Sequence, residues 1–177
     1  MIDDPKVLIC LSASDAWYGR IIRWASRSRV NHTFLLYRSD VWGWFAVEIN
    51  ENGVQLIPPS RLTRVDYLEC WRCDEDLLHG LAGMRRWIGA GYDWRGLLSG
   101  LVRLVVRRLF GMSIDGASHS AKRLFCSEAA AVVLRNAAAP GSDSIDPPNT
   151  SPGDLRRLFR AHPAYHKVSC PVTRYGG

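Results

Sequence analysis

A cysteine at the start of an alanine-rich segment is the residue in this sequence best suited to nucleophilic chemistry. Cys126 opens residues 126–134 (CSEAAAVVL), whose composition predicts a helix. A thiol in the first turn of a helix lies beside unpaired backbone N–H groups and the positive end of the helix dipole, which together favour the thiolate. The same N–H groups can stabilise the oxyanion of a tetrahedral intermediate. Cys126 is therefore the candidate nucleophile.

A histidine and a glutamate on two adjacent predicted strands are the candidate partners of this thiol. Residues 29–38 and 44–50 have strand patterns, and a symmetric hairpin between them has its midpoint near position 41. Residue 32 then pairs near residue 50, which makes Glu48 the diagonal neighbour of His32. The imidazole can take the thiol proton, and the carboxylate can hold the imidazole in the required tautomer.

The remaining pattern predicts an α+β fold in a single domain, residues 1–177, because domains commonly have ~100–200 residues. The predicted strands form an antiparallel sheet in meander order and cover residues 6–12, 29–38, 44–50, 54–57 and 65–72. The turn at Asn52-Gly53 is expected to adopt positive φ. The predicted helices cover residues 16–26, 77–90, 94–110 and 124–139, with a last helix from Ser151 or Asp154 to 160. Residues 161–177 are expected to be an irregular tail.

In their order, several pieces resemble the circularly permuted branch of the NlpC-type papain-like cysteine hydrolases, which includes the YiiX-like proteins. The pieces are residues 30–37 (VNHTFLLY), 46–50 (AVEIN) with Gly53-Val54, 91–94 (GYDW), 124–128 (LFCSE) and 146–155 (DPPNTSPGDL). The resemblance implies a papain-like, permuted fold in which a small antiparallel sheet or barrel packs against helices. It also implies that Cys126 is the nucleophile, His32 the base and Glu48 the orienting residue, without a metal or an organic cofactor.

The same resemblance implies the substrate, a peptidoglycan peptide or another γ-glutamyl-type amide, and a role at a bacterial cell wall or in a phage particle. Tyr92 and Ser127 are the candidate substrate-binding residues. A phenol at Tyr92 would line the cleft, although simple packing explains it equally well. Asp93 is expected to cap the helix that starts at Trp94.

The net charge of +6 and the isoelectric point near 9.3 favour an anionic partner, such as a wall polymer or an anionic membrane surface. Nucleic acid is not an expected partner because no nucleic-acid-binding motif is present. The acidic start of the chain does not resemble a signal peptide, and no apolar run is long enough to span a membrane. We therefore expect synthesis in a reducing cytoplasm with free thiols.

Several alternative interpretations stay open. Cys126 can be a buried small hydrophobe, His79 or His119 can be the base, and the other cysteines, including Cys70 and Cys73, fit structural roles. Residues 97–110 combine an apolar stripe with arginines at 103, 107 and 108, which fits a helix packed on the core better than a helix on a membrane. The alternative functions are a lipid acyltransferase similar to the lecithin:retinol acyltransferase branch and a basic adaptor without catalysis.

Overall fold

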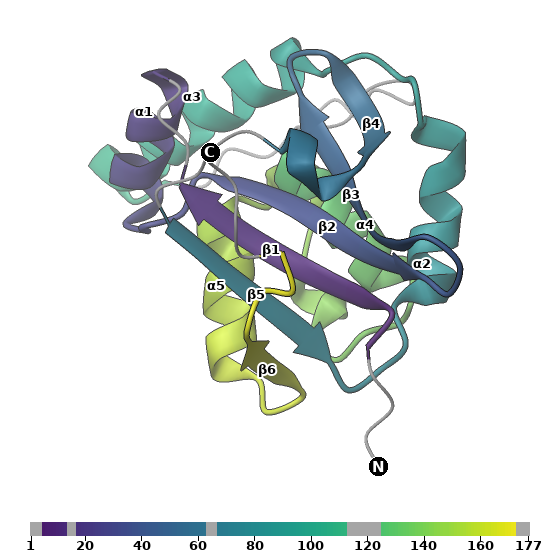
Figure 1. Cartoon of the computed structure of the whole chain (residues 1–177). Helices are drawn as coiled ribbons and strands as arrows, with labels where there is room; N and C mark the ends of the chain where they lie inside the picture. Colours follow the sequence, from purple (N-terminus) through teal and green to yellow (C-terminus); the bar gives the residue numbers. More distant parts are fainter. Residues whose placement is uncertain (1–4, 14–16, 63–66, 113–124, 173–177) are drawn as a thin grey trace.

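In the part of the chain that the structure describes, six strands form one antiparallel sheet in the order β4-β3-β2-β1-β5-β6 (Figure 1). The computed structural model describes residues 5–13, 17–62, 67–112 and 125–172, except for the side chains of Trp17 and Tyr67. The strands are β1 (Val7–Ala13), β2 (His32–Ser39), β3 (Gly43–Asn50), β4 (Gly53–Ile57), β5 (Tyr67–Cys73) and β6 (Tyr165–Val168). The predicted α+β class and the first four strands are confirmed.

The predicted meander order holds only for β1 to β4. The fifth strand, β5, pairs with β1 rather than with β4, so β1 lies in the interior of the sheet. Every residue of β1 is buried, which is the pattern of a strand covered on both faces and paired at both edges. The expected irregular tail instead contains β6, which pairs with β5 through Cys70↔Val168 to Cys73↔Tyr165.

In the described residues, five α-helices accompany the sheet: α1 (Trp17–Ser26), α2 (Leu78–Ala82), α3 (Trp94–Phe110), α4 (Cys126–Asn136) and α5 (Pro152–Ala161). The predicted limits of α3 are confirmed, because the Asp93 carboxylate accepts from the Gly96 N–H and Gly111 ends the helix at φ 67°. The predicted start of α5 is also confirmed, since the Ser151 hydroxyl accepts from the Asp154 N–H. No helix in the described parts of the chain is long and apolar enough to cross a membrane.

The helix predicted over residues 77–90 is wrong in extent. It stops after α2 and continues as a 3₁₀ helix, Gly83–Trp87. Gly80 lies so close to α4 that a Cβ there would be 2.1 Å from the carbonyl oxygen of Val133. Glycine permits this contact but has a low helix propensity, which favours a short helix here.

The main core lies between one face of the sheet and the helices α4 and α5, which lie behind the sheet in Figure 1. Ile9 and Leu11 of β1 and Leu35 of β2 face this core. Three consecutive alanines of α4, residues 129–131, are almost completely buried. Small side chains at these positions allow the helix backbone to approach the sheet closely.

A buried ion cluster connects α5 and β6 to β5. The Glu69 carboxylate is 0% exposed and accepts two hydrogen bonds from Arg156, at 2.9 and 3.1 Å. Arg160 and Lys167 approach the same carboxylate at 3.2 and 3.4 Å. A buried carboxylate with this many cationic donors is fully paired, so the cluster fixes the position of α5 relative to the sheet.

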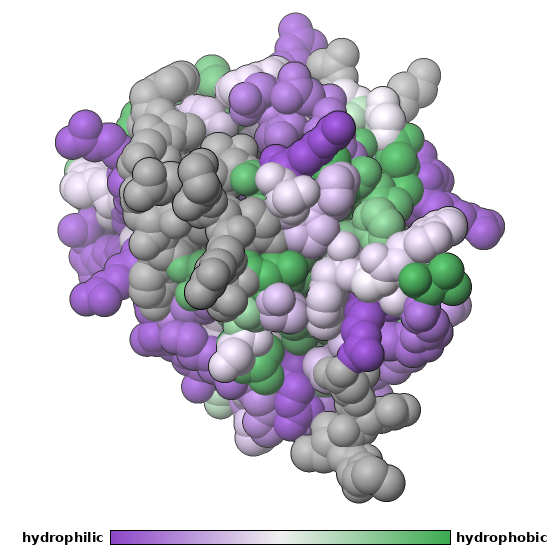
Figure 2. Space-filling view, in the orientation of Figure 1, coloured by the Kyte–Doolittle hydropathy of each residue, from purple (hydrophilic) through white to green (hydrophobic). Residues whose placement is uncertain are grey.

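A second, smaller core covers the opposite face of the sheet. It contains Leu8, Phe34 and Leu36, with Leu62 and the C-terminal Val172 packed over them. In Figure 1 the C-terminal segment crosses in front of this face. Figure 2 shows the same side in space-filling form, where hydrophobic residues form separate patches between hydrophilic ones.

The β3–β4 hairpin contacts the segment that leads into α3. Gly53 has φ +96°, as predicted for the turn, and a Cβ there would lie 2.2 Å from the Ala90 carbonyl oxygen. The Val54 N–H donates to Ala90 O at 2.9 Å, and the Gly89 N–H donates to Val54 O at 2.8 Å. These bonds hold the residues just before Tyr92 against the hairpin.

Candidate functional site

Cys126 is the first residue of α4, as the sequence predicts, and it follows Phe125 in extended backbone conformation. Burial raises the pKa of Cys126 to about 11, although the backbone N–H groups of Thr33, Ser127 and Cys126 itself lower it. The thiol is 6% exposed. The expected N–H donors are therefore present, but the expected net lowering of the pKa is absent because desolvation outweighs them. In this closed arrangement the sulfur carries its proton at neutral pH.

The sulfur lies where β2 and β3 separate. The register between these strands runs from Ser39↔Gly43 to Leu35↔Val47 and stops before Thr33. Backbone N–H groups along a strand point alternately to its two sides, and the Arg38 N–H donates to Lys6 O on the β1 side. The N–H of Thr33 therefore points toward the β3 side. The Cys126 sulfur is close enough to interact with this N–H.

His32 and Glu48 form a pair in the predicted diagonal arrangement. The observed ladder ends at Leu35↔Val47, and the same offset extended along both strands would place residue 32 opposite residue 50. The His32 Nε2 lies 4.0 Å from the Glu48 Oε1. Burial lowers the pKa of His32 to about 4, so the imidazole is neutral at pH 7. Burial raises the pKa of Glu48, while a hydrogen bond from the Asn50 amide (3.0 Å) lowers it.

Cys126 lies near the backbone next to His32, but its sulfur makes no direct bond to the His32 side chain. The sulfur approaches Thr33, the residue that follows His32. The imidazole lies on the sheet face of Phe34, whose ring centroid is 6.3 Å away, whereas α4 packs on the other face. Among the described residues, no hydrogen bond joins the imidazole to the sulfur. Catalysis through this pair therefore requires the two side chains to rotate toward each other where the strands separate.

The alternative bases are placed differently. His79 is on α2, whose Gly80 contacts Val133. Val133 lies seven residues along α4 from Cys126, which corresponds to about 10 Å of helix. His79 is therefore beside the far part of α4. His119 falls outside the described residues.

Tyr18, Tyr92 and Trp94 form an aromatic cluster, and its two tyrosines lie near Cys126. The Trp94 ring has edge-to-face contacts with Tyr92 (centroids 5.0 Å apart) and Tyr18 (6.0 Å). Burial raises the pKa of Tyr92 strongly, and a charge on Cys126 contributes to that rise, so the phenol and the thiol are close. The pKa of Tyr18 is raised by burial and by charges on Glu51 and Cys126. Sequence reasoning named Tyr92 and missed Tyr18, because an isolated tyrosine in a helix has no distinguishing pattern.

The side chain of Ser127 has a structural role. Its hydroxyl donates to the Thr150 carbonyl oxygen at 2.7 Å, and the residue is buried. This bond fastens the start of α4 to the turn at Pro147–Asn149 and the residues after it. A substrate contact by Ser127 would consequently use its backbone N–H.

A partly enclosed apolar pocket adjoins Cys126. It has a cavity volume of about 40 Å³, which exceeds the roughly 10–15 Å³ needed by one water. Its walls include Leu97 and Leu101 of α3, Phe125 and Cys126, and residues 148–152. The Arg103 guanidinium donates to the Asn149 side chain at 2.7 Å and thereby connects the two walls. The space suits a small apolar group, and a larger one requires α3 and residues 148–152 to separate.

Glu128 is a further titratable residue close to Cys126. It belongs to the LFCSE segment, but the sequence alone assigned it no role. Burial raises its pKa to about 7, and a hydrogen bond from the Phe125 N–H (3.3 Å) lowers it. The carboxyl group lies two residues beyond Cys126 and caps the same helix turn. The position of Glu128 at the third residue of the helix is typical of a capping residue, and this spacing could have identified it from the sequence.

Comparison with known proteins leaves the family of this chain open. No family model matches the sequence, and no curated protein matches it. The geometry described above is therefore the basis for a functional proposal.

Proposed function

We propose that this chain is a cysteine hydrolase of the permuted papain-like type, which cleaves an amide bond through an acyl-thioenzyme. One observation carries the proposal: the sulfur at the start of α4 contacts the backbone beside His32, and His32 faces Glu48. A thiol, a neutral imidazole and a carboxyl group thus lie near one end of β2, with the thiol in the core on the α4 side of the sheet and the imidazole on the opposite face. An antiparallel sheet with the cysteine helix packed on one face is consistent with that class.

In the proposed reaction, His32 takes the Cys126 proton as the sulfur attacks the substrate carbonyl. The backbone N–H groups of Cys126 and Ser127 stabilise the oxyanion, and the imidazolium gives its proton to the leaving amine. His32 then removes a proton from water, which attacks the thioester and releases the acid. Glu48 holds the imidazole in the correct orientation and stabilises its charged form.

The raised pKa of the thiol and the lowered pKa of the imidazole fit a neutral resting pair. The proton then moves during attack, when the substrate has replaced water at the site. We propose a peptidoglycan peptide or another γ-glutamyl-type amide as substrate, in a bacterial cell wall or phage setting. The net charge of +6 favours association with an anionic wall polymer.

The test compares the purified protein with Cys126→Ala on muropeptides and γ-glutamyl dipeptides, with mass spectrometry of products and of the intact chain. We expect cleavage and an acyl adduct on Cys126 in the wild type, and neither in the variant. Cys73→Ala is the matched control, because Cys73 is a buried thiol of β5 that has no role in the proposal. Equal cleavage by wild type and Cys126→Ala would contradict the proposal.

A second candidate, acyl transfer or ester hydrolysis on a lipid at an anionic membrane, is favoured by the surface of α3. The prediction that its apolar stripe lies in the core is confirmed for Leu97 but wrong for Leu98 (55% exposed). Val102 and Phe110 are 57% and 68% exposed, and Arg107 is exposed on the same helix. The pocket that α3 shares with Cys126 is apolar, as an acyl chain requires.

Vesicle flotation distinguishes the two candidates. If the lipid candidate is correct, the protein floats with vesicles that contain anionic lipid, Phe110→Ser reduces flotation, and a long-chain ester rather than a muropeptide acylates Cys126. Val41→Ser, which changes an exposed apolar residue of the β2–β3 connection, is the control. Absence of flotation together with muropeptide cleavage supports the first candidate alone.

A further inference from the structure

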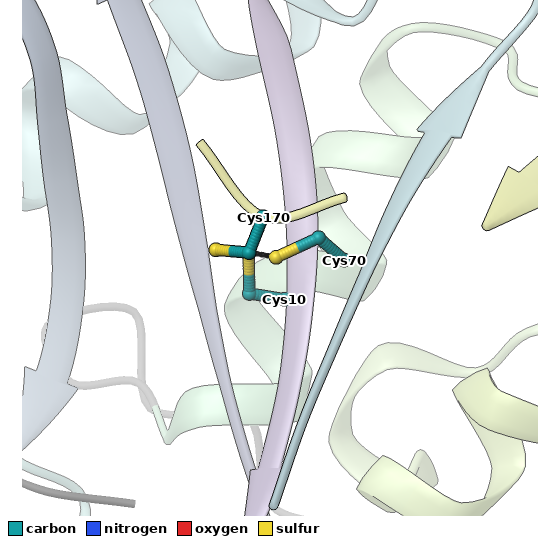
Figure 3. A group of neighbouring side chains, drawn as sticks. All are labelled: Cys10, Cys70 and Cys170. Carbon is teal, nitrogen blue, oxygen red and sulfur yellow. Dashed lines mark hydrogen bonds between the residues drawn. The ribbon is translucent and has the colours of Figure 1, made fainter. Parts of the chain in front are cut away.

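Three cysteine sulfurs meet on the face of the sheet opposite α4 (Figure 3). Cys10 of β1 and Cys70 of β5 are direct cross-strand partners, and their Sγ atoms are 3.0 Å apart. Cys170 follows β6 on the segment that crosses over β1. All three Sγ atoms lie within 4.8 Å of one another. Cys126 packs in the other core, so this cluster is separate from the candidate active site.

We propose that Cys10, Cys70 and Cys170 bind one thiophilic divalent metal ion with a filled d shell, such as Zn(II), through three thiolates. A Zn–S bond of ~2.3 Å places bound sulfurs roughly 3.8–4.0 Å apart. The Cys10–Cys70 separation of 3.0 Å is shorter than that value, and the other two sulfur–sulfur separations are at most 4.8 Å. Rotations of the cysteine side chains are therefore sufficient to form the site without moving the strands.

The surroundings favour a divalent ion over a monovalent one. Leu8, Phe34 and Leu36 pack around Cys10 and Cys70 in the second core. Three thiolates and a divalent ion leave a net charge of −1, whereas Cu(I) leaves −2, and burial of charge among apolar groups is unfavourable. Within the described residues, no histidine or carboxylate joins the three sulfurs, so a water at the partly exposed Cys170 side completes the tetrahedron.

Metal binding at this site would release protons. The three cysteines form no disulfide; Cys10 and Cys70 are buried and Cys170 is partly exposed. Because only thiolates coordinate, binding of the ion displaces the thiol protons to solvent.

The site would connect three distant parts of the chain. Cys10 and Cys70 are 60 residues apart, and Cys70 and Cys170 are 100 apart (70 − 10 and 170 − 70). The ion would hold the C-terminal segment across β1 and β5 and close the second core. Because it binds only the folded arrangement, it stabilises that state in proportion to its affinity and concentration.

The experiment is a titration of the reduced, full-length protein with Cd(II), which reports thiolate ligation by its ultraviolet charge-transfer band. We expect saturation at one ion per chain, a rise in the melting temperature, and competition by Zn(II). In Cys170→Ser, we expect the affinity to fall by at least ~100-fold, beyond the roughly 10–100-fold that loss of an outer-shell partner causes. Cys170 is partly exposed and near the chain end, so this variant is the one expected to fold.

Cys73→Ser and Cys126→Ser are the matched controls, because both remove a buried thiol from outside the cluster. Equal Cd(II) affinity in Cys170→Ser and wild type would overturn the proposal, as would the absence of a band in the wild type. A Cys10–Cys70 disulfide in the freshly purified protein, detected by peptide mass spectrometry, would also overturn it, because that bond removes two of the three ligands.

Discussion

The imidazole of His32 faces the carboxylate of Glu48 at 4.0 Å, and burial shifts both groups toward their uncharged forms. Because the imidazole is neutral at pH 7, the two do not form an ion pair in the resting protein. An ion pair arises only when His32 accepts a proton. The relationship is thus suited to a carboxylate that stabilises an imidazolium during a reaction and contributes little to folding.

Glu48→Gln is expected to separate the contribution of the carboxylate to the reaction from its contribution to folding. Gln keeps an acceptor for the Asn50 amide but cannot stabilise an imidazolium, so acylation of Cys126 by an activated ester should slow by roughly 10²–10⁴-fold. The free energy of unfolding at pH 7 should not decrease, since burial disfavours the ionised carboxylate. Stopped-flow acylation and urea unfolding measure the two effects. Glu51→Gln, in the exposed turn, is the control; an equal loss of rate in both variants would show that Glu48 has no special role.

His32 should make stability depend on pH. Its pKa is about 4 in the folded chain, against an ordinary value of 6.5. Between these values the unfolded chain binds the proton and the folded chain does not, so stability is present above pH 6.5 and falls as the pH drops toward 4. The shift corresponds to about 3 kcal/mol. Urea unfolding at pH 7 and pH 4.5 should show a larger loss in wild type than in His32→Gln, and parallel losses would contradict the assignment.

Ser127→Ala tests whether this residue serves structure or substrate. The variant leaves the buried Thr150 carbonyl without its donor, which should reduce the free energy of unfolding by about 1–3 kcal/mol. The backbone N–H at position 127 remains, so the acylation rate of the folded protein should change less than tenfold. A variant with unchanged stability and a raised KM would instead assign the hydroxyl to substrate binding.

Glu69→Gln should be among the most destabilising single changes in the chain. It leaves the guanidinium of Arg156 next to a neutral partner in a largely buried place, at an expected loss of roughly 3–5 kcal/mol. Asp40→Asn removes the exposed pair with Lys6 and should change stability by less than about 1 kcal/mol. Chemical denaturation of both variants gives the comparison. Similar small losses would mean that the Glu69 cluster is not energetically coupled to the fold.

Features governed by neighbouring residues could be predicted from the sequence. The His32–Glu48 diagonal followed from the length of one hairpin, and the limits of α3 followed from Asp93 and Gly111. In each case the physical cause lies within a short stretch of chain: a turn, a cap or an alternation of faces.

Features that depend on distant parts of the chain could not be predicted. The pairing of β5 with β1 and the close approach of Gly80 to Val133 are long-range contacts. The same holds for the cluster of Cys10, Cys70 and Cys170, whose spacings match no local metal motif. The raised pKa of Cys126 could not be predicted either. The sequence pattern indicated the helix N-terminus, but it did not indicate how deeply the thiol is buried.

The position of β1 has a consequence for the chain as it leaves the ribosome. Its first neighbour, β2, is synthesised soon afterwards, but its second neighbour, β5, begins only at Tyr67. Until then, a largely apolar edge with unpaired N–H and C=O groups is available to other nascent chains. The interval in which the first four strands exist without the fifth is therefore a period in which the nascent chain is prone to aggregate.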